Sequence, residues 1–226
     1  MKIQHILLLS LSLFSFNLLA EPRIAQSPED IKPLLNGMQA PMVSLQDATG
    51  KAVEFNSVLK QQDTVLVFYR GGWCPYCNLQ LAALREIEPK LKALGYQLIA
   101  VTPDSPASIQ ASLKDTKGAA ITYTLLSDSQ FNLSSAFGVA YYLDEKTSAT
   151  YLNTYKLNLN KEASSGKVVL PVPAVYILNK EGLVQYSYQH INYKVRLQPE
   201  LLLLAAHLCQ FYQPICFIKQ QMEKID

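Results

Sequence analysis

The sequence predicts a single α/β domain in which helices flank a central mixed sheet. Residues 65–69 form a continuous apolar run rich in β-branched and aromatic side chains, which is typical of a strand buried on both faces. After this run, strand-like and helix-like segments alternate along the chain, and that alternation favours a sheet with parallel strands. Roughly two hundred residues follow the first twenty, which is enough for one hydrophobic core.

Residues 1–20 have the pattern of a secretory signal. A basic start precedes an apolar stretch from Ile6 to Phe16, which is well short of the roughly 20 residues that span a bilayer. We expect cleavage after Ala20 and a periplasmic or secreted protein. A membrane-tethered form would result if the signal stays uncleaved, because Leu18 is large for its place in the cleavage site. Residues 21–226 then make up the single domain.

Short elements are expected before the core strand. Ser27, Pro28 and the two acids that follow predict a helix that runs to Leu35. Residues 42–55 alternate loosely about a turn at 47–50, which predicts a hairpin, and Asn56 is placed to cap a helical turn.

The core elements follow in chain order. The sequence predicts strands at 64–69, 97–101 and 122–126, and helices at 75–94, from 105 onward and at 129–137. In the long helix, apolar residues recur at near-helical spacing, and Gly95 stands where a left-handed C-cap belongs.

The last third of the chain departs from this rhythm. Residues 141–167 are polar and predict an insertion or long surface loop, and a hairpin of strands at 174–178 and 183–188 follows. Residues 199–208 predict an amphipathic or buried helix, and 209–226 form a C-terminal extension that holds Cys209 and Cys216.

The chemistry lies in the stretch Gly-Gly-Trp-Cys-Pro-Tyr-Cys at residues 71–77. A C-x-x-C pair at the start of a helix places Cys74 at the exposed positive end, where unpaired amides and the helix dipole stabilise a thiolate. Cys77 lies one turn inward and can attack a mixed disulfide formed at Cys74. This pattern indicates thiol–disulfide exchange with Cys74 as nucleophile and Cys77 as resolving thiol.

Other functions are less well supported by the residues. A zinc site would need a second closely spaced ligand pair, and Cys209 and Cys216 are too far apart in sequence. A disulfide that closes so short a loop as residues 74–77 would stabilise little. The net charge of +2 is well mixed along the chain, which argues against a nucleic-acid surface.

These residues resemble the thioredoxin superfamily, and within it the peroxiredoxin-like branch named for alkyl hydroperoxide reductase and thiol-specific antioxidant (AhpC/TSA). The similarity is carried by residues 65–77, 101–106, 126–128, 137–139 and 172–182. It implies a thioredoxin-like fold with an N-terminal extension and an insertion before the strand of the cis-proline. It further implies that Pro173 is that cis-proline, that Val172 binds partner backbone, and that Trp73 shields the disulfide.

The sequence also departs from the pattern of this superfamily. Peroxiredoxins that reduce hydroperoxides resemble one another in a Pro-x-x-x-Thr-x-x-Cys loop, and here Val67 and Gly71 stand in the proline and threonine places. Thioredoxin carries a buried acid where this chain has Phe68, so the sequence identifies no proton acceptor for Cys77. Two arginines are candidates for the arginine that polarises the peroxide, Arg196 and the nearer Arg70, although a surface charge is the commoner role for both.

Further polar residues have simpler interpretations. Cys74, Cys77 and His190 would supply three ligands for Cu(I), which makes a copper carrier a third hypothesis, while His190 and His207 also fit ordinary surface positions. Cys209 and Cys216 predict a local structural disulfide across Pro214.

The sequence therefore predicts an exported thiol–disulfide oxidoreductase that uses Cys74 and Cys77, with a thiol or disulfide protein as electron donor or acceptor and no cofactor. The alternative is a thiol-dependent hydroperoxide reductase in which Cys74 is peroxidatic and Cys77 resolving. Asp104 and Asp128 are expected to be loop and cap residues and not an acid–base pair.

Overall fold

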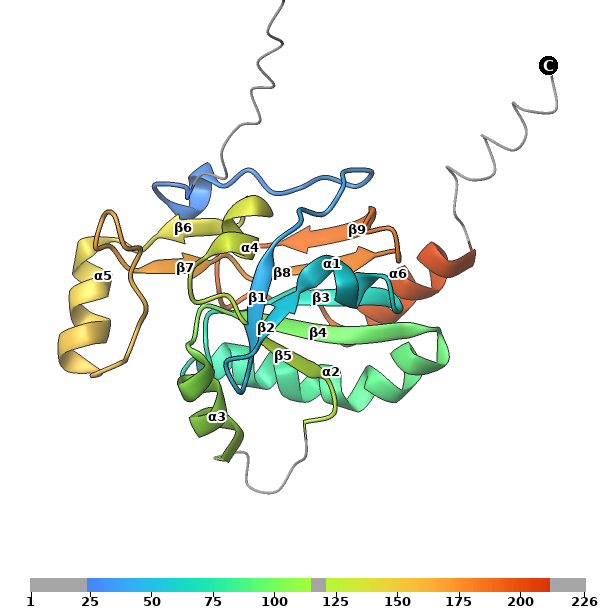
Figure 1. The fold of residues 1–226 in the computed structure, drawn as a ribbon, viewed down its shortest axis with the longest axis horizontal. Helices are drawn as coiled ribbons and strands as arrows, with labels where there is room; N and C mark the ends of the chain where they lie inside the picture. Colours follow the sequence, from blue (N-terminus) through green and yellow to red (C-terminus); the bar gives the residue numbers. More distant parts are fainter. Residues whose placement is uncertain (1–23, 115–120, 212–226) are drawn as a thin grey trace, which may run out of the picture.

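The computed structural model describes residues 24–114 and 121–211. Its centre is a seven-stranded sheet with the order β2-β1-β5-β4-β3-β8-β9 (Figure 1). The strands are β1 (Ser44–Asp47), β2 (Ala52–Glu54), β3 (Asp63–Phe68), β4 (Tyr96–Thr102), β5 (Thr124–Ser127), β8 (Ala174–Leu178) and β9 (Val184–Gln189). β3, β4 and β5 run parallel, and antiparallel hairpins extend the sheet on both sides. The predicted mixed central sheet is confirmed.

Helices cover both faces of the sheet because the strand residues alternate between two cores. On one face, Val65 and Val67 of β3 pack with α2 (Pro75–Ala93) and α6 (Pro199–Phe211). On the other face, Leu66 and Phe68 pack with α1 (Phe55–Leu59) and α4 (Asn132–Ala136). α3 (Pro106–Lys114) lies beside β5. Within the described ranges, no helix combines the length and the apolar character needed to cross a membrane.

The N-terminal helix expected from Ser27 to Leu35 is wrong beyond its first turn. Only a 3-10 turn, η1 (Pro28–Asp30), forms. Pro33 disfavours helical backbone at Lys32, and the N–H groups of Lys32 and Leu34 instead donate to carbonyls of the segment after α4. The α1 turn forms as expected, but it begins at Phe55, so Asn56 lies inside it and does not cap it.

The segment 141–167 is more structured than a surface loop. It holds most of β6 (Ala140–Tyr142), then α5 (Glu145–Ala149) and a π-helical turn, η2 (Thr150–Thr154). β6 pairs with β7 (Val169–Pro171), and together with α5 these strands form a lobe at one end of the molecule (Figure 1). Side chains from this segment, Tyr141 and Leu159 among them, build a small core of their own with Val172. Whether it is an insertion stays a prediction.

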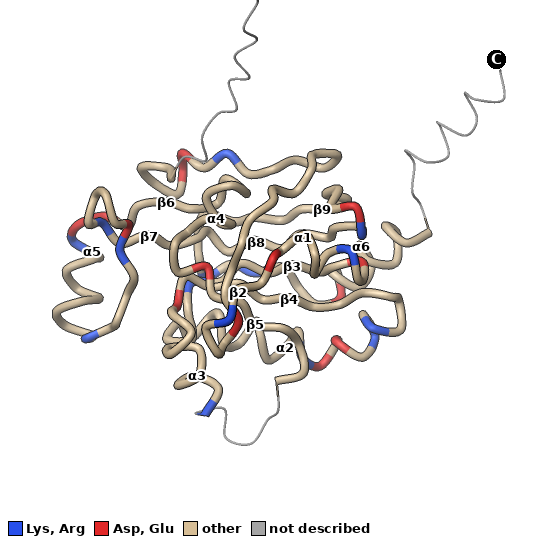
Figure 2. Tube along the Cα trace, viewed as in Figure 1, with Lys and Arg blue, Asp and Glu red and all other residues tan. Residues whose placement is uncertain are grey.

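The ionic side chains do not gather into one field. Figure 2 shows lysine, arginine, aspartate and glutamate spread over the molecule with both signs intermingled. This distribution agrees with the mixed charge pattern of the sequence. The electrostatics of a site in this protein therefore depend on the charged side chains close to that site.

Candidate active site

Cys74 and Cys77 lie where β3 passes into α2 through a short loop. Cys74 is the N-cap of α2, and its carbonyl accepts hydrogen bonds from the N–H groups of Cys77 and Asn78, which forms the first turn. Both cysteines are free thiols. Cys74 is only 1% exposed and Cys77 is fully buried, so the expected exposed position of Cys74 is wrong. Cys74 lies at the amino end of α2 as predicted, but other segments cover it.

The surroundings of Cys74 favour its thiolate. A hydrogen bond with the Cys77 thiol is the largest cause that lowers the pKa of Cys74, to about 6, and burial opposes it. The backbone N–H of Cys77 and the positive charges of Arg70 and Arg196 also lower this pKa. Cys74 is therefore largely ionised at neutral pH, and a thiolate is the nucleophilic form of cysteine.

Cys77 has the opposite character. Burial raises the pKa of Cys77 strongly, and the neighbouring Cys74 raises it further, whereas Arg196 lowers it. Arg196 reaches this thiol directly, since its Nη2 lies 3.3 Å from Cys77 Sγ. Its Nη1 donates to Gln80 Oε1 at 3.1 Å, and Gln80 is itself buried on α2. Cys77 is thus a protonated thiol held against a positive charge.

Arg70 is a second buried arginine beside Cys74. The residue is 2% exposed, and its guanidinium carbon lies 4.2 Å from the ring centre of Tyr193, 5.3 Å from that of Trp73 and 5.7 Å from that of Tyr151. Its Nη2 donates to the hydroxyl of Tyr151 at 3.5 Å, whereas Nε and Nη1 have no hydrogen-bond partner. Across the described residues, the one ion pair joins Lys92 and Glu88. Burial lowers the pKa of Arg70, but Tyr141, Tyr151 and the charge of Cys74 outweigh it and raise this pKa.

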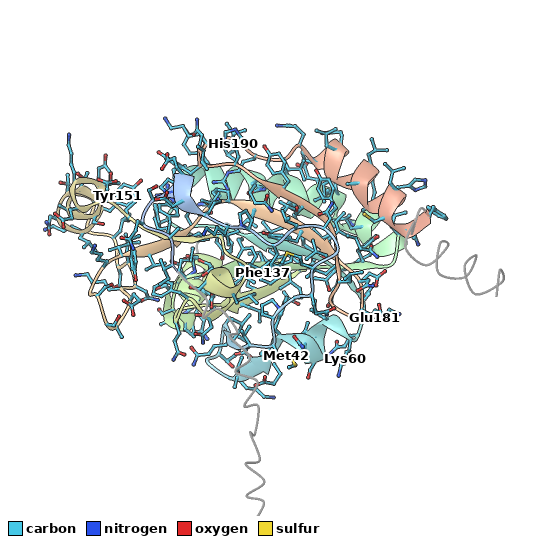
Figure 3. All side chains as sticks on the ribbon, turned by 90° about the horizontal axis from the view of Figure 1, so that it is seen from above. Met42, Lys60, Phe137, Tyr151, Glu181 and His190 are labelled. Carbon is cyan, nitrogen blue, oxygen red and sulfur yellow. The ribbon has the colours of Figure 1, made fainter. Side chains whose placement is uncertain are left out.

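Both arginines contradict the surface role that is commoner for this residue type. Arg196 is 119 positions from Cys77 in sequence, and Tyr151 is 81 positions from Arg70, so no local pattern announces these contacts. Tyr151 comes from the π-helical turn η2, a kind of turn that is often found at functional sites. Figure 3 shows Tyr151 on the lobe at one end of the molecule. The unusual density of tyrosines in 141–167 was the signal in the sequence that could have pointed here.

The loop before Cys74 is held by Asp104. The buried carboxylate of Asp104 accepts the N–H of Gly72 at 2.7 Å, and burial raises the pKa of Asp104. Gly71 has a φ of 145°, and a Cβ on it would collide with the indole of Trp73. Trp73 packs against the small core of the 141–167 lobe as well as the main core, so it joins the loop to both. Asp104 is a loop residue as expected, and Asp128 caps α4 by accepting the N–H groups of Leu133 and Ser134.

The expectation of a cis-proline is wrong, since no peptide bond among the described residues is cis. The trans form of Pro173 agrees with the general preference of X-Pro bonds for trans, which is about 0.5–1 kcal/mol. Val172 is fully buried, and its N–H donates to the carbonyl of Val139 at 2.8 Å. In this conformation that N–H is not free to pair with the backbone of a partner.

The copper hypothesis finds no geometric support. No group of three His, Cys, Asp or Glu side chains that could hold a metal occurs in the described part of the chain, so His190 does not join the two thiols. His190 follows β9, and its Nδ1 accepts the N–H of Asn192 at 3.0 Å. Cys209 lies on α6, but Cys216 lies outside the described residues, so the disulfide between them stays a prediction.

Comparison with known proteins agrees with this architecture. A model described as the AhpC/TSA family matches residues 36–187, which is more than half of the chain. The chain belongs to the AhpC/TSA family. Chloroplastic peroxiredoxin Q from Oryza sativa subsp. japonica is 30% identical over 164 residues, which cover 73% of this chain and 61% of the relative. The putative peroxiredoxin bcp of Haemophilus influenzae is 28% identical over 109 residues, 48% of this chain and 68% of the relative.

Solved AhpC/TSA-like structures share the fold. Enterococcus faecalis AhpC has a TM-score of 0.59 at 21% identity, with 80% of this chain and 94% of that chain covered. Xanthomonas campestris peroxiredoxin Q has a TM-score of 0.55 at 19% identity, with 74% and 91% covered. The predicted thioredoxin-like, peroxiredoxin-like fold is thereby confirmed. The match spans 61% of the length of the rice peroxiredoxin Q. The activity of that relative is therefore only a proposal for this chain.

Proposed function

We propose that this AhpC/TSA protein is a thiol-dependent hydroperoxide reductase in which Cys74 attacks the peroxide and Cys77 resolves the product. The sequence alone favoured disulfide exchange and gave peroxide reduction as the alternative. The family match and the similarity to proteins named peroxiredoxin Q and bcp support that alternative. The observation that carries the proposal is the buried Cys74, whose pKa the charge of Arg70 helps to lower, together with the two unpaired nitrogens of Arg70, Nε and Nη1.

The reaction needs only the groups already in place. The Cys74 thiolate attacks one peroxide oxygen, so that an S–O bond forms and the O–O bond breaks. The leaving alkoxide takes a proton from solvent and departs as an alcohol, or as water from hydrogen peroxide. The Cys77 sulfur then attacks Cys74, so that the S–S bond forms and the S–O bond breaks, and the Cys77 proton leaves with the hydroxyl as water.

The enclosure of the site supports a small substrate. A protein disulfide must bring its own sulfur into line with Cys74, which is 1% exposed between the Trp73 loop and the arginines. A hydroperoxide needs only a narrow opening. The free N–H groups of Arg70 are suited to bind the negative charge that develops on the leaving oxygen.

Disulfide exchange is the second candidate, and Gly71 favours it. This glycine stands where the peroxiredoxin motif has threonine, so the chain lacks that hydroxyl beside Cys74. Cys77, one turn along α2, provides the adjacent resolving thiol that exchange requires. Export directed by residues 1–20 is a separate part of the proposal. These residues lie outside the described ranges, so export stays a prediction from the sequence.

The deciding experiment is a pair of second-order rates for the reduced protein, with hydrogen peroxide and with a protein disulfide. Trp73 is the single tryptophan and adjoins the site, so its fluorescence reports both reactions. A peroxide rate orders of magnitude above that of a free cysteine supports the peroxidase. A peroxide rate like that of free cysteine, together with rapid exchange, would replace it with the second candidate.

A further inference from the structure

The buried Cys77 thiol is poorly suited, by itself, to its part in the proposed reaction. To resolve an oxidised Cys74, the sulfur of Cys77 must attack as a thiolate, because the thiolate is the nucleophilic form of cysteine. Cys77 is fully buried, and in the reduced protein it lies beside an ionised Cys74. Burial and this neighbouring charge both raise the pKa of Cys77. The resolving step therefore needs a group that stabilises negative charge on this sulfur.

Arg196 is a cation in direct contact with Cys77. Its Nη2 lies 3.3 Å from Cys77 Sγ, and its Nη1 donates to Gln80 Oε1 at 3.1 Å. Gln80 is 8% exposed and lies three residues after Cys77 on α2, so both side chains are on one face of the helix. The sulfur and the amide therefore hold the two ends of the same guanidinium, and the contact with Cys77 is fixed in direction.

The two arginines of the site act on different sulfurs. The guanidinium carbon of Arg70 lies 4.2 Å from the ring centre of Tyr193. Besides the hydrogen bond from Cys77, the charges of Arg70 and Arg196 lower the pKa of Cys74. For Cys77, whose pKa burial raises most, the charge that lowers it is that of Arg196, and Arg70 contributes a backbone hydrogen bond. Arg196 is thus the arginine whose charge reaches the resolving sulfur.

Oxidation of Cys74 makes the charge of Arg196 available to Cys77. In the reduced protein, the Cys74 thiolate raises the pKa of Cys77, in addition to burial, and opposes the effect of Arg196. A protonated sulfenic acid at Cys74 carries no charge, so this opposition ends when the peroxide has reacted. The contact between Arg196 and Cys77 then favours a thiolate at Cys77 at the stage of the reaction that requires one.

We propose that Arg196 is a catalytic residue of the resolving step, in which its guanidinium holds Cys77 as a thiolate during attack on the sulfenic acid of Cys74, and that Gln80 positions this guanidinium. The proposal rests on the proposed function, which supplies the sulfenic acid. It assigns Arg196 to the second sulfur and not to the peroxide, for which the sequence made this arginine a candidate.

The step is balanced without a further reactant. Cys77 gives its proton to solvent, and its thiolate forms the S–S bond with Cys74 as the S–O bond breaks. Hydroxide leaves with the electron pair of the S–O bond and takes up a proton from solvent, which yields water. Arg196 keeps its protons throughout and is not consumed.

Rapid mixing of the reduced protein with hydrogen peroxide at a pH of about 8 separates the two steps. All proteins carry Cys209→Ser and Cys216→Ser, so that Cys74 and Cys77 are the only cysteines. Trp73 fluorescence follows the time course. The mass of acid-quenched samples shows whether sulfenic acid or disulfide is present, which assigns the first phase to peroxide attack and the second to resolution.

Arg196→Gln should slow the second phase about three- to thirtyfold. Loss of a charge at this distance raises the pKa of a thiol by about one to three units, and the higher nucleophilicity of the more basic thiolate recovers part of the rate. The first phase should slow less than about twofold, because Cys74 has a pKa of about 6 and stays ionised at this pH. Arg196→Lys keeps the charge and should restore most of the second-phase rate, and Gln80→Leu should slow that phase less than Arg196→Gln does.

Lys194→Gln is the matched control. It removes a positive charge two residues before Arg196, where Nζ of Lys194 lies 5.9 Å from the ring centre of Tyr76. Its second phase should match that of the parent protein. Equal slowing of both phases in Arg196→Gln, or a Lys194→Gln second phase as slow as that of Arg196→Gln, overturns the proposal.

The first phase of the parent protein tests the proposed function separately. A first-phase rate like that of free cysteine would remove the peroxidase function. Excess peroxide would still convert Cys74 to the sulfenic acid in that case, and the second phase would still show whether Arg196 assists its resolution.

Discussion

Gly71 and Trp73 exclude a side chain from the place next to Cys74. A Cβ on Gly71 would overlap Nε1 of the Trp73 indole and lie 2.7 Å from Asp104 Oδ1. The φ of Gly71 is 145°, which other residues rarely adopt. The absence of the threonine found in the peroxiredoxin motif is therefore built into the loop, because the indole occupies that space.

Gly71→Thr should destabilise the protein by about 2 kcal/mol or more, through backbone strain and collision with the indole. It should not raise the peroxide rate, because the new hydroxyl cannot be accommodated without displacing Trp73. Urea unfolding and Trp73 fluorescence measure both effects. Gly166→Ala is the control, since Gly166 also has positive φ but nothing lies within 4 Å of its Cβ position. Equal destabilisation by both changes would contradict the collision.

Arg70→Gln should raise the pKa of Cys74 from about 6 by about one unit, because the positive charge that favours the thiolate is lost. The alkylation rate of the reduced protein, followed against pH, gives the midpoint. Cys77→Ala should raise the midpoint further, since the hydrogen bond with Cys77 is the largest cause of the lowered pKa. Arg85 lies on α2, as Cys77 does, and lines a pocket with Tyr123 and Leu125. Arg85→Gln should therefore leave the midpoint unchanged. A shift of similar size in Arg85→Gln would show that the effect is not local.

Tyr151→Ala should slow the peroxide reaction about two- to fivefold, because the ring and hydroxyl that position Arg70 are lost. Tyr151→Phe keeps the ring and loses the hydroxyl, so its peroxide rate should fall between those of Tyr151→Ala and the wild type. Tyr155→Ala is the control, since Tyr155 is exposed in the next turn. Its ring lies 6.0 Å from that of Tyr151, whereas the rings that lie under Arg70 are those of Trp73, Tyr151 and Tyr193. Single-turnover rates with hydrogen peroxide check the order of the three variants.

Asp128 should make the protein less stable as the pH rises from about 4 to about 6. Burial raises the pKa of Asp128 to about 6 in the folded protein, so the folded state holds a proton that the unfolded state has lost. The stability present below the unfolded pKa is lost as pH rises through the folded one, by up to about 3 kcal/mol. Comparison of urea unfolding in wild type and Asp128→Asn across this range isolates the effect. Parallel pH profiles would mean that Asp128 does not titrate as described.

Local patterns in the sequence were sufficient for the sheet and for the cysteine pair. The apolar run in β3 and the helical spacing of apolar residues in α2 are patterns of residues that are close together in the sequence. They can therefore be recognised before the fold is known. The C-x-x-C spacing fixes the placement of the two thiols at the helix end for the same reason.

Only the tertiary structure decided what surrounds those thiols. Arg196 and Tyr151 reach the site from segments far along the chain, and their contacts depend on how β9, α6 and the 141–167 lobe fold back over the start of α2. The burial of Val172 and the hydrogen bond of its N–H to the carbonyl of Val139 likewise depend on a segment far along the chain. The sequence by itself determined the core strands and helices and the place of the two sulfurs, because these depend on short-range periodicity. The charge around the sulfurs depends on long-range contacts, and these exist only in the folded chain.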